Sequence, residues 1–168
     1  VSSGSAQESK TSLSATPIIA DDLLVFCTGY NRVIALDPES GVERWAFDPK
    51  VRNRKLEGPY TRVCRGVAYW NGGDAPAGGA CATRIFAGTL DSELVALDAK
   101  TGKVLKQARL TGALEDYYSS PIGVDGKVYI ATEHGKVVVL RAAGDWEILA
   151  INDFDSEIFA TPALAEKE

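Results

Sequence analysis

The chain has few side chains that could do chemistry, and they lie in separate short segments. Arg65 stands in the motif C-R-G-V, Ser119 and Ser120 precede a proline, and the only histidine, His134, follows Glu133 in a predicted hairpin turn. A guanidinium is an always-charged planar fork of donors, which suits a ligand that carries carbonyl or carboxylate groups. Ser-His-Asp or Cys-His catalysis would have one base, in a surface turn. No G-x-S-x-G, P-loop, H-E-x-x-H or C-x-x-C motif is present.

Each of these residues also has a structural interpretation. Arg65 could pair with a loop acid such as Asp74, and serines at a strand start also satisfy backbone groups. Glu133 is a candidate metal ligand, but a lone carboxylate in a hairpin turn is commonly solvated, and calcium takes about six or more oxygens. The residues by themselves leave both interpretations open for Arg65, Ser119, Ser120 and Glu133.

Three cysteines set the expectations about redox state. Cys27 lies in an apolar strand pattern and is predicted to be a small buried hydrophobe. Cys64 and Cys81 bracket a segment rich in Gly and Pro, so we predict a disulfide between them that stabilises the fold by roughly 3 kcal/mol. The alternative is two unrelated thiols in a reducing compartment. A disulfide would indicate an oxidising compartment such as the periplasm.

Charge and hydropathy argue against two kinds of partner. The net charge is −5, with both signs interspersed, which disfavours nucleic acid because phosphate binding requires a basic surface. No stretch approaches the roughly 18 apolar residues of a membrane-spanning helix. The opening segment VSSGSAQESK lacks the apolar core of a signal peptide, and its composition predicts a flexible tail over residues 1–12.

A repeat must position these residues. A small residue followed by Pro, an alternating apolar strand, a second strand and a Gly turn occur in residues 15–45 and again in 119–149, and residues 83–107 repeat the later part of the unit. The period of two and the Val, Ile, Leu and Phe content predict strands. We therefore predict an all-β fold, a partial β-propeller over residues 13–168. Its blades should cover about residues 13–50, 62–112 and 117–153, with the opening strand of a fourth at 158–165.

One motif of this repeat resembles a known family. The pattern A-x-D-x-x-x-G-x-x-x-W is similar to the tryptophan-docking motif of quinoprotein propellers, in which the Trp of one blade packs against the motif of the next blade. Its residues here are Ala35, Asp37, Gly41 and Trp45.

The second blade keeps Ala96, Asp98 and Gly102 of this motif, and we expect Leu105 in place of the Trp. Residues 15–103 resemble the N-terminal blades of the membrane-type pyrroloquinoline quinone (PQQ) dehydrogenases, which oxidise sugars and alcohols. Residues from 117 onward resemble generic PQQ-like propeller repeats.

The resemblance implies a cofactor site. In this family the Arg of the C-R-G-V motif contacts the quinone, and Arg65 matches it. Ser14 stands where many members carry a Glu that binds the cofactor, and Ser119 and Ser120 match hydroxyls near the cofactor. Glu133 falls close to where a calcium-ligating Glu would lie. PQQ and Ca²⁺ are therefore the expected cofactors.

The resemblance also implies a function. The chain would be a portion of a periplasmic or cell-envelope dehydrogenase that oxidises a sugar or alcohol hydroxyl and transfers the hydride to the quinone. The family's catalytic Asp and calcium ligands come from later blades, so the chain is expected to be incomplete or inactive alone. The remaining blades, or another copy, would complete the ring. The alternative is a non-catalytic PQQ-like repeat protein that serves as a binding or assembly scaffold of the cell envelope.

Overall fold

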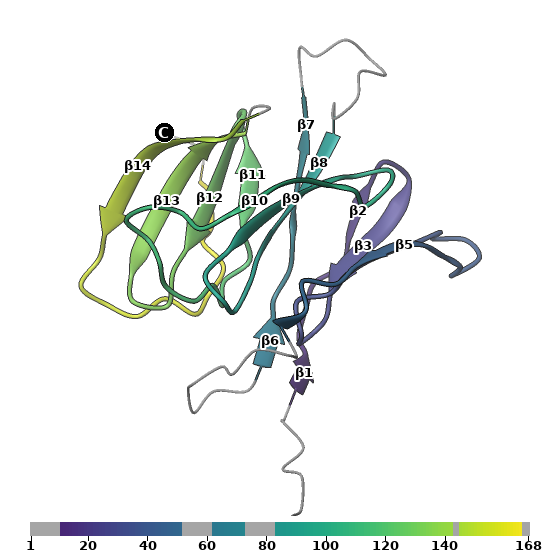
Figure 1. Cartoon of the computed structure of the whole chain (residues 1–168), viewed down its shortest axis with the longest axis horizontal. Helices are drawn as coiled ribbons and strands as arrows, with labels where there is room; N and C mark the ends of the chain where they lie inside the picture. Colours follow the sequence, from purple (N-terminus) through teal and green to yellow (C-terminus); the bar gives the residue numbers. More distant parts are fainter. Residues whose placement is uncertain (1–10, 52–61, 73–82, 143–144, 166–168) are drawn as a thin grey trace, which may run out of the picture.

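A computed structural model describes residues 11–51, 62–72, 83–142 and 145–165. In these ranges the regular elements are strands, arranged in three four-stranded antiparallel sheets and one two-stranded sheet. The three larger sheets lie side by side as successive blades of a propeller (Figure 1). The prediction of an all-β propeller fold is thus confirmed.

Each blade is a meander whose strands follow one another in chain order, because short turns join antiparallel neighbours. Blade 1 contains β2 (Ile18–Ala20), β3 (Leu23–Cys27), β4 (Val33–Leu36) and β5 (Glu43–Phe47). Blade 2 contains β7 (Ala68–Asn71), β8 (Thr83–Gly88), β9 (Leu94–Asp98) and β10 (Val104–Ala108). Blade 3 contains β11 (Ile122–Val124), β12 (Lys127–Ala131), β13 (Lys136–Arg141) and β14 (Glu147–Asp153).

Two boundaries differ from the sequence prediction. β1 (Thr11–Leu13) pairs in parallel with β6 (Arg62–Cys64), so residues 11 and 12 belong to a strand and not to the predicted tail. Residues 158–165 do not form the predicted strand. A strand requires a hydrogen-bonded neighbour, and no described segment pairs with these residues along a ladder.

The outermost strand of every blade bulges at the same place. Trp45 lies opposite Ala35 in blade 1, Lys106 opposite Ala96 in blade 2, and Ala150 opposite a valine in blade 3, each beside an irregularity in the register. The residue that replaces the Trp in blade 2 is therefore Lys106 and not Leu105 as predicted. Both blades have the bulge at the same place, and the spacing from Gly41 to Trp45, counted from Gly102, also ends at Lys106, so the prediction was one residue short.

The docking motif works as the resemblance implied. The Trp45 indole Nε1–H donates a hydrogen bond to the Ala99 carbonyl of blade 2 at 3.1 Å. The ring covers Gly102, where an added Cβ would lie 2.5 Å from the Trp45 Cε3 atom. Gly102 has φ +68°, a conformation that glycine adopts without a steric penalty. A tryptophan of blade 1 thus packs directly on the turn of blade 2.

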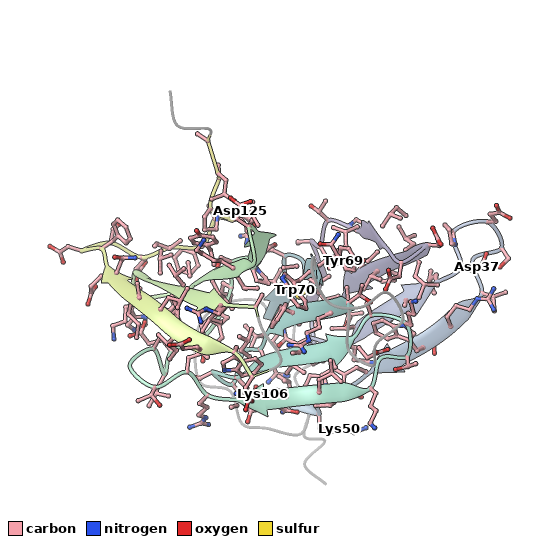
Figure 2. The ribbon with its side chains drawn as sticks, turned by 90° about the horizontal axis from the view of Figure 1, so that it is seen from above. Asp37, Lys50, Tyr69, Trp70, Lys106 and Asp125 are labelled. Atoms are coloured by element: carbon pink, nitrogen blue, oxygen red, sulfur yellow. A yellow bond between two sulfur atoms is a disulfide. The ribbon has the colours of Figure 1, made fainter. Side chains whose placement is uncertain are left out.

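Two hydrophobic cores fill the spaces between blades, because alternate residues of each strand face the neighbouring sheet. The core between blades 1 and 2 is formed mainly by Val25, Val33, Trp45, Ile85, Val95 and Leu97. The core between blades 2 and 3 is formed mainly by Phe86, Leu94, Tyr117, Ile130, Val138 and Leu140. Figure 2 shows blade 2 between the other two, with Tyr69 and Trp70 near the middle and Asp37 at the far end of blade 1.

Candidate functional site

The inner strands of the three blades begin at one shared edge of the molecule. Thr16, Gly66 and Ser120 each stand two residues before an inner strand, β2, β7 and β11 respectively. The Thr16 N–H donates to the Arg65 carbonyl at 2.9 Å, and a Cβ on Gly66 would lie 2.8 Å from the Ser120 Oγ. The Ser120 N–H in turn lies 3.4 Å from the Thr161 hydroxyl oxygen. We call the group Thr16, Arg65, Gly66, Ser120 and Thr161 the strand-entry edge.

Arg65 brings the positive charge to this edge. Its side chain is exposed, while Cys64 on one side and Gly66 on the other are buried. The loop acid Asp74, the alternative partner that the sequence suggested, lies outside the described residues. Among the described residues no hydrogen bond or ion pair fixes the Arg65 guanidinium, so its place depends on how the backbone beneath it is held.

The two serines before Pro121 have different surroundings. Ser119 is buried, and its hydroxyl donates to the Ala131 carbonyl at 2.9 Å and accepts from the Ala131 N–H at 3.3 Å. That geometry matches the structural interpretation, in which the serine satisfies backbone groups within blade 3. Ser120 is half-buried at the strand-entry edge beside Gly66. Ser14 is exposed and precedes this edge by two residues.

The disulfide prediction was wrong in its partner. Cys64 is bonded to Cys27, with the Cα atoms 5.9 Å apart, and Cys81 lies outside the described residues. Cys27 is buried as predicted, but as a half-cystine that links the end of β3 to the end of β6. Strands that are distant in sequence are adjacent in space here, and loop composition carried no signal of this. A cross-link over 37 residues stabilises the fold by about 4 kcal/mol on the chain-entropy model.

A turn recurs beside the strand-entry edge, and in blade 3 it is the hairpin turn predicted around Glu133 and His134. In each blade a Thr follows the second strand, and its N–H donates a hydrogen bond to the carbonyl of the residue four positions later. These residues are Thr28, Thr89 and Thr132. The residue three positions after each Thr has positive φ: Asn31 (+56°), Ser92 (+67°) and Gly135 (+98°). A Thr followed after three positions by Asn, Ser or Gly was the available signal.

These turns also connect one blade with the next. The buried Asn31 side chain accepts a hydrogen bond from the Leu90 N–H of blade 2 at 3.0 Å. The Glu133 N–H donates to the Asp116 carbonyl at 2.9 Å, and the Ile158 N–H donates to the Glu133 carbonyl at 2.9 Å. The turn hydrogen bonds therefore hold the blades at a fixed spacing around the strand-entry edge.

Glu133 is more buried than the solvated carboxylate that is common in a hairpin turn. Only 14% of the Glu133 side chain is exposed. The His134 Nδ1 lies 3.9 Å from the Glu133 carboxylate, and the His134 side chain is 66% exposed, as expected for a surface turn. Burial raises the pKa of Glu133, His134 opposes this, and Asp116, Glu157 and Glu115 raise it further. In the described part of the chain no group of three or more His, Cys, Asp or Glu could hold a metal ion. The described residues thus do not assemble a calcium site around Glu133.

The strand-entry edge offers one guanidinium together with hydroxyl and backbone donors, which is a donor set for carboxylate and carbonyl oxygens. Across the described ranges, no helix is long and apolar enough to span a bilayer.

Comparison with known proteins agrees with this geometry. Residues 2–115 match the family model described as "Glucose/ethanol/alcohol dehydrogenase, beta-propeller domain". Quinohemoprotein alcohol dehydrogenase ADH IIB of Pseudomonas putida is 39% identical over 124 residues, which cover 70% of this chain and 16% of the relative. The glycerol dehydrogenase large subunit of Gluconobacter oxydans is 39% identical over 99 residues, which cover 58% of this chain and 13% of the relative.

A solved structure is similar as well. Quinohemoprotein alcohol dehydrogenase ADHIIG of Pseudomonas putida superposes with a TM-score of 0.66 at 30% identity, over 82% of this chain and 20% of the other. The chain thus spans between 13% and 16% of the length of the two curated relatives named above.

Proposed function

Since the chain belongs to the PQQ family of glucose/ethanol/alcohol dehydrogenase β-propeller domains, we propose that its three blades supply part of the PQQ-binding wall of a dehydrogenase. The substrate class would be a sugar or alcohol hydroxyl. We further propose that residues 13–168 act as one propeller unit, which the remaining blades or another copy would complete into a ring.

One observation carries this proposal, namely the convergence of Thr16, Arg65 and Ser120 at the strand-entry edge. PQQ carries carboxylates and quinone carbonyls, and the exposed Arg65 guanidinium with the Ser120 hydroxyl is a donor set that fits those oxygens. When bound, PQQ supplies the electron-accepting quinone, because cofactors carry the difficult redox step. Arg65 would bind and orient an acidic or carbonyl edge of the cofactor, and Ser120 would donate a second hydrogen bond. Ser14, exposed beside this edge, is a further candidate contact.

The described residues fit a calcium ion less well than they fit PQQ. The family implies a calcium ion, but in the described part of the chain no group of three or more His, Cys, Asp or Glu, around Glu133 or elsewhere, could hold one. We assign no step of the reaction to a metal held by the described residues.

The disulfide supports a proposal for the compartment. A buried disulfide between Cys27 and Cys64 persists where thiols are oxidised, which supports a periplasmic or cell-envelope location. A dehydrogenase of this kind would meet its small-molecule substrate there.

Co-elution with PQQ tests the proposal. The chain is incubated with PQQ, with and without calcium, and separated on a desalting column, and the absorbance of the quinone is followed in the protein fraction. We expect the quinone to travel with the protein. Protein that elutes free of quinone under both conditions would contradict the proposal and favour the non-catalytic scaffold.

A further inference from the structure

We infer that the Cys27–Cys64 disulfide positions Arg65, so that the oxidised bond holds the strand-entry edge in its binding geometry and reduction loosens it. The inference deepens the proposed function and rests on it for the identity of the ligand, whereas the positioning itself can be measured without any ligand.

The disulfide ends at Cys64, the residue directly before Arg65. Cys64 is the last residue of β6 and precedes Arg65, while Cys27 is the last residue of β3 in blade 1. Both half-cystines are buried, with relative exposures of 0% and 5%. The bond thus fixes the backbone one residue before Arg65 to a central strand of the neighbouring blade.

The other restraints that the described residues place on this segment are non-covalent. Val67 is buried in the core between blades 1 and 2, and the Arg62 guanidinium lies 5.7 Å from the Tyr30 ring centroid. Among the described strands, β6 is three residues long and pairs with β1, which is also three residues long, in the two-stranded sheet visible at the lower centre of Figure 1. Residues 65–67 lie between β6 and β7 outside any sheet, and the Thr16 N–H bond to the Arg65 carbonyl is their backbone tie to blade 1. Short parallel pairs are weak on their own. Removal of the disulfide therefore leaves this segment held by non-covalent contacts alone, so its local opening should become easier.

The geometry of Arg65 is sensitive to such opening. Its side chain is exposed and no described side chain holds it, so displacement of its backbone displaces the guanidinium directly. Gly66 also lies close to blades 1 and 3, since an added Cβ would lie 2.8 Å from the Ser120 Oγ and 3.6 Å from the Thr16 carbonyl oxygen. Loss of alignment between blades 1, 2 and 3 at this edge would separate the donors that must act on one ligand.

The chemical step is a thiol–disulfide exchange. Two equivalents of a monothiol reductant transfer two electrons and two protons to the Cys27–Cys64 disulfide. The S–S bond breaks, Cys27 and Cys64 become thiols, and the reductant is oxidised to its own disulfide. Because both sulfurs are buried, attack requires the β1–β6 edge to open first, so the reaction should be slow in the folded protein.

Hydrogen exchange and ligand affinity test the inference together. The Cys81→Ser background prevents disulfide shuffling, and the oxidised protein, the reduced protein and the Cys27→Ala/Cys64→Ala variant are compared. Amide exchange at Thr16 is measured against the amides of β12 in blade 3, and PQQ affinity is measured in parallel. Gly102→Ala serves as a control that weakens the contact between blades 1 and 2 without touching the segment around Arg65.

We expect reduction to accelerate exchange at Thr16 at least tenfold with little change in β12, and to weaken PQQ binding at least fivefold. Equal acceleration at Thr16 and in β12, no change at Thr16, or an equal effect of Gly102→Ala would overturn the inference in favour of general stabilisation. If Thr16 responds selectively but the oxidised protein binds no PQQ, the positioning role stands and the proposed function fails.

Discussion

At the scale of single residues, positive φ angles identify the positions where side-chain type matters most. The β2–β3 turn places Asp21 at φ +48° and Asp22 at φ +62°, and the corresponding turn of blade 3 has Asp125 at +47° and Gly126 at +68°. Both turns have the left-handed geometry that favours glycine at the second position. Blade 3 satisfies this preference and blade 1 does not.

Substitution of Asp22 by Gly should therefore stabilise the protein. We expect Asp22→Gly to raise the free energy of unfolding by about 0.5–1 kcal/mol, since it relieves a left-handed conformation at an exposed side chain. The neighbouring Asp21→Gly should destabilise it, because Asp21 accepts hydrogen bonds from the Tyr69 and Thr83 hydroxyls of blade 2. Urea unfolding measures both, and a loss of stability in Asp22→Gly would contradict the turn assignment.

Two neighbouring glutamates should respond to pH in opposite directions. Burial raises the folded-state pKa of Glu133, so its ionisation costs stability as pH rises through that pKa. Glu133→Gln should then be more stable than the parent at pH 7 by about 0.5 kcal/mol, since solvent screens the effect. The gain should vanish below the pKa of the unfolded glutamate.

Glu115 provides the matched control. Burial alone raises its pKa, but hydrogen bonds from Thr132 and Lys136 outweigh burial and lower it. Glu115→Gln should therefore lose stability at pH 7, and the loss should shrink as pH falls through the folded-state pKa. Urea unfolding at pH 4 and pH 7 tests both variants. If millimolar calcium stabilised the parent but not Glu133→Gln, Glu133 would be a metal ligand after all.

The residue types could be predicted from sequence more reliably than their partners. The turn acids were evident because turn chemistry is local; Asp37 accepts the Ser40 N–H at 2.9 Å, as a turn acid should. The partner of Cys64 was not evident, because Cys27 is equally consistent with a buried thiol until the two strands are placed side by side. The burial of Glu133 likewise depends on Asp116 and on residues 154–158 of the chain that follows blade 3.

At the scale of elements, the contacts between blades are made by different chemistry at equivalent positions. Trp45 of blade 1 docks on Gly102, whereas Lys106, at the same position of blade 2, donates to the Asp145 carboxylate at 2.8 Å and lies 4.7 Å from the Trp146 ring centroid. An apolar contact has been replaced by an ion pair and a cation–π contact. The strand pattern predicted the blades, and the motif spacing counted from Gly102 specifies Lys106 as the residue at the docking position.

The two glycines of the docking turns form a natural pair for mutation. Gly41 (φ +71°) and Gly102 (φ +68°) have the same backbone conformation, but an added Cβ meets nothing at Gly41 and meets the Trp45 ring at Gly102. Gly41→Ala should cost about 1 kcal/mol from backbone strain alone. Gly102→Ala should cost about 1–3 kcal/mol more because the indole must move. Equal losses in thermal or urea unfolding would show that the indole does not pack on Gly102 in solution.

At the scale of the whole molecule, the three sheets bring the residues that precede their inner strands together at the strand-entry edge. The propeller could be predicted from the repeat, since period-two strands and Gly turns recur along the chain. That Thr16, Arg65 and Ser120 meet at one edge follows from the stacking of blades, which the sequence pattern does not specify residue by residue.

The most direct test of this account is the affinity of the chain for PQQ when the charge at the strand-entry edge is removed. Calorimetric titration compares the parent, Arg65→Ala and Arg44→Ala, the last of which removes an exposed arginine from the Asp37 turn of blade 1. We predict that Arg65→Ala weakens binding at least about tenfold, since hydrogen bonds to charged groups contribute roughly 1.5–3 kcal/mol, and that Arg44→Ala leaves the affinity unchanged. Equal affinity of the parent and Arg65→Ala would contradict the central claim.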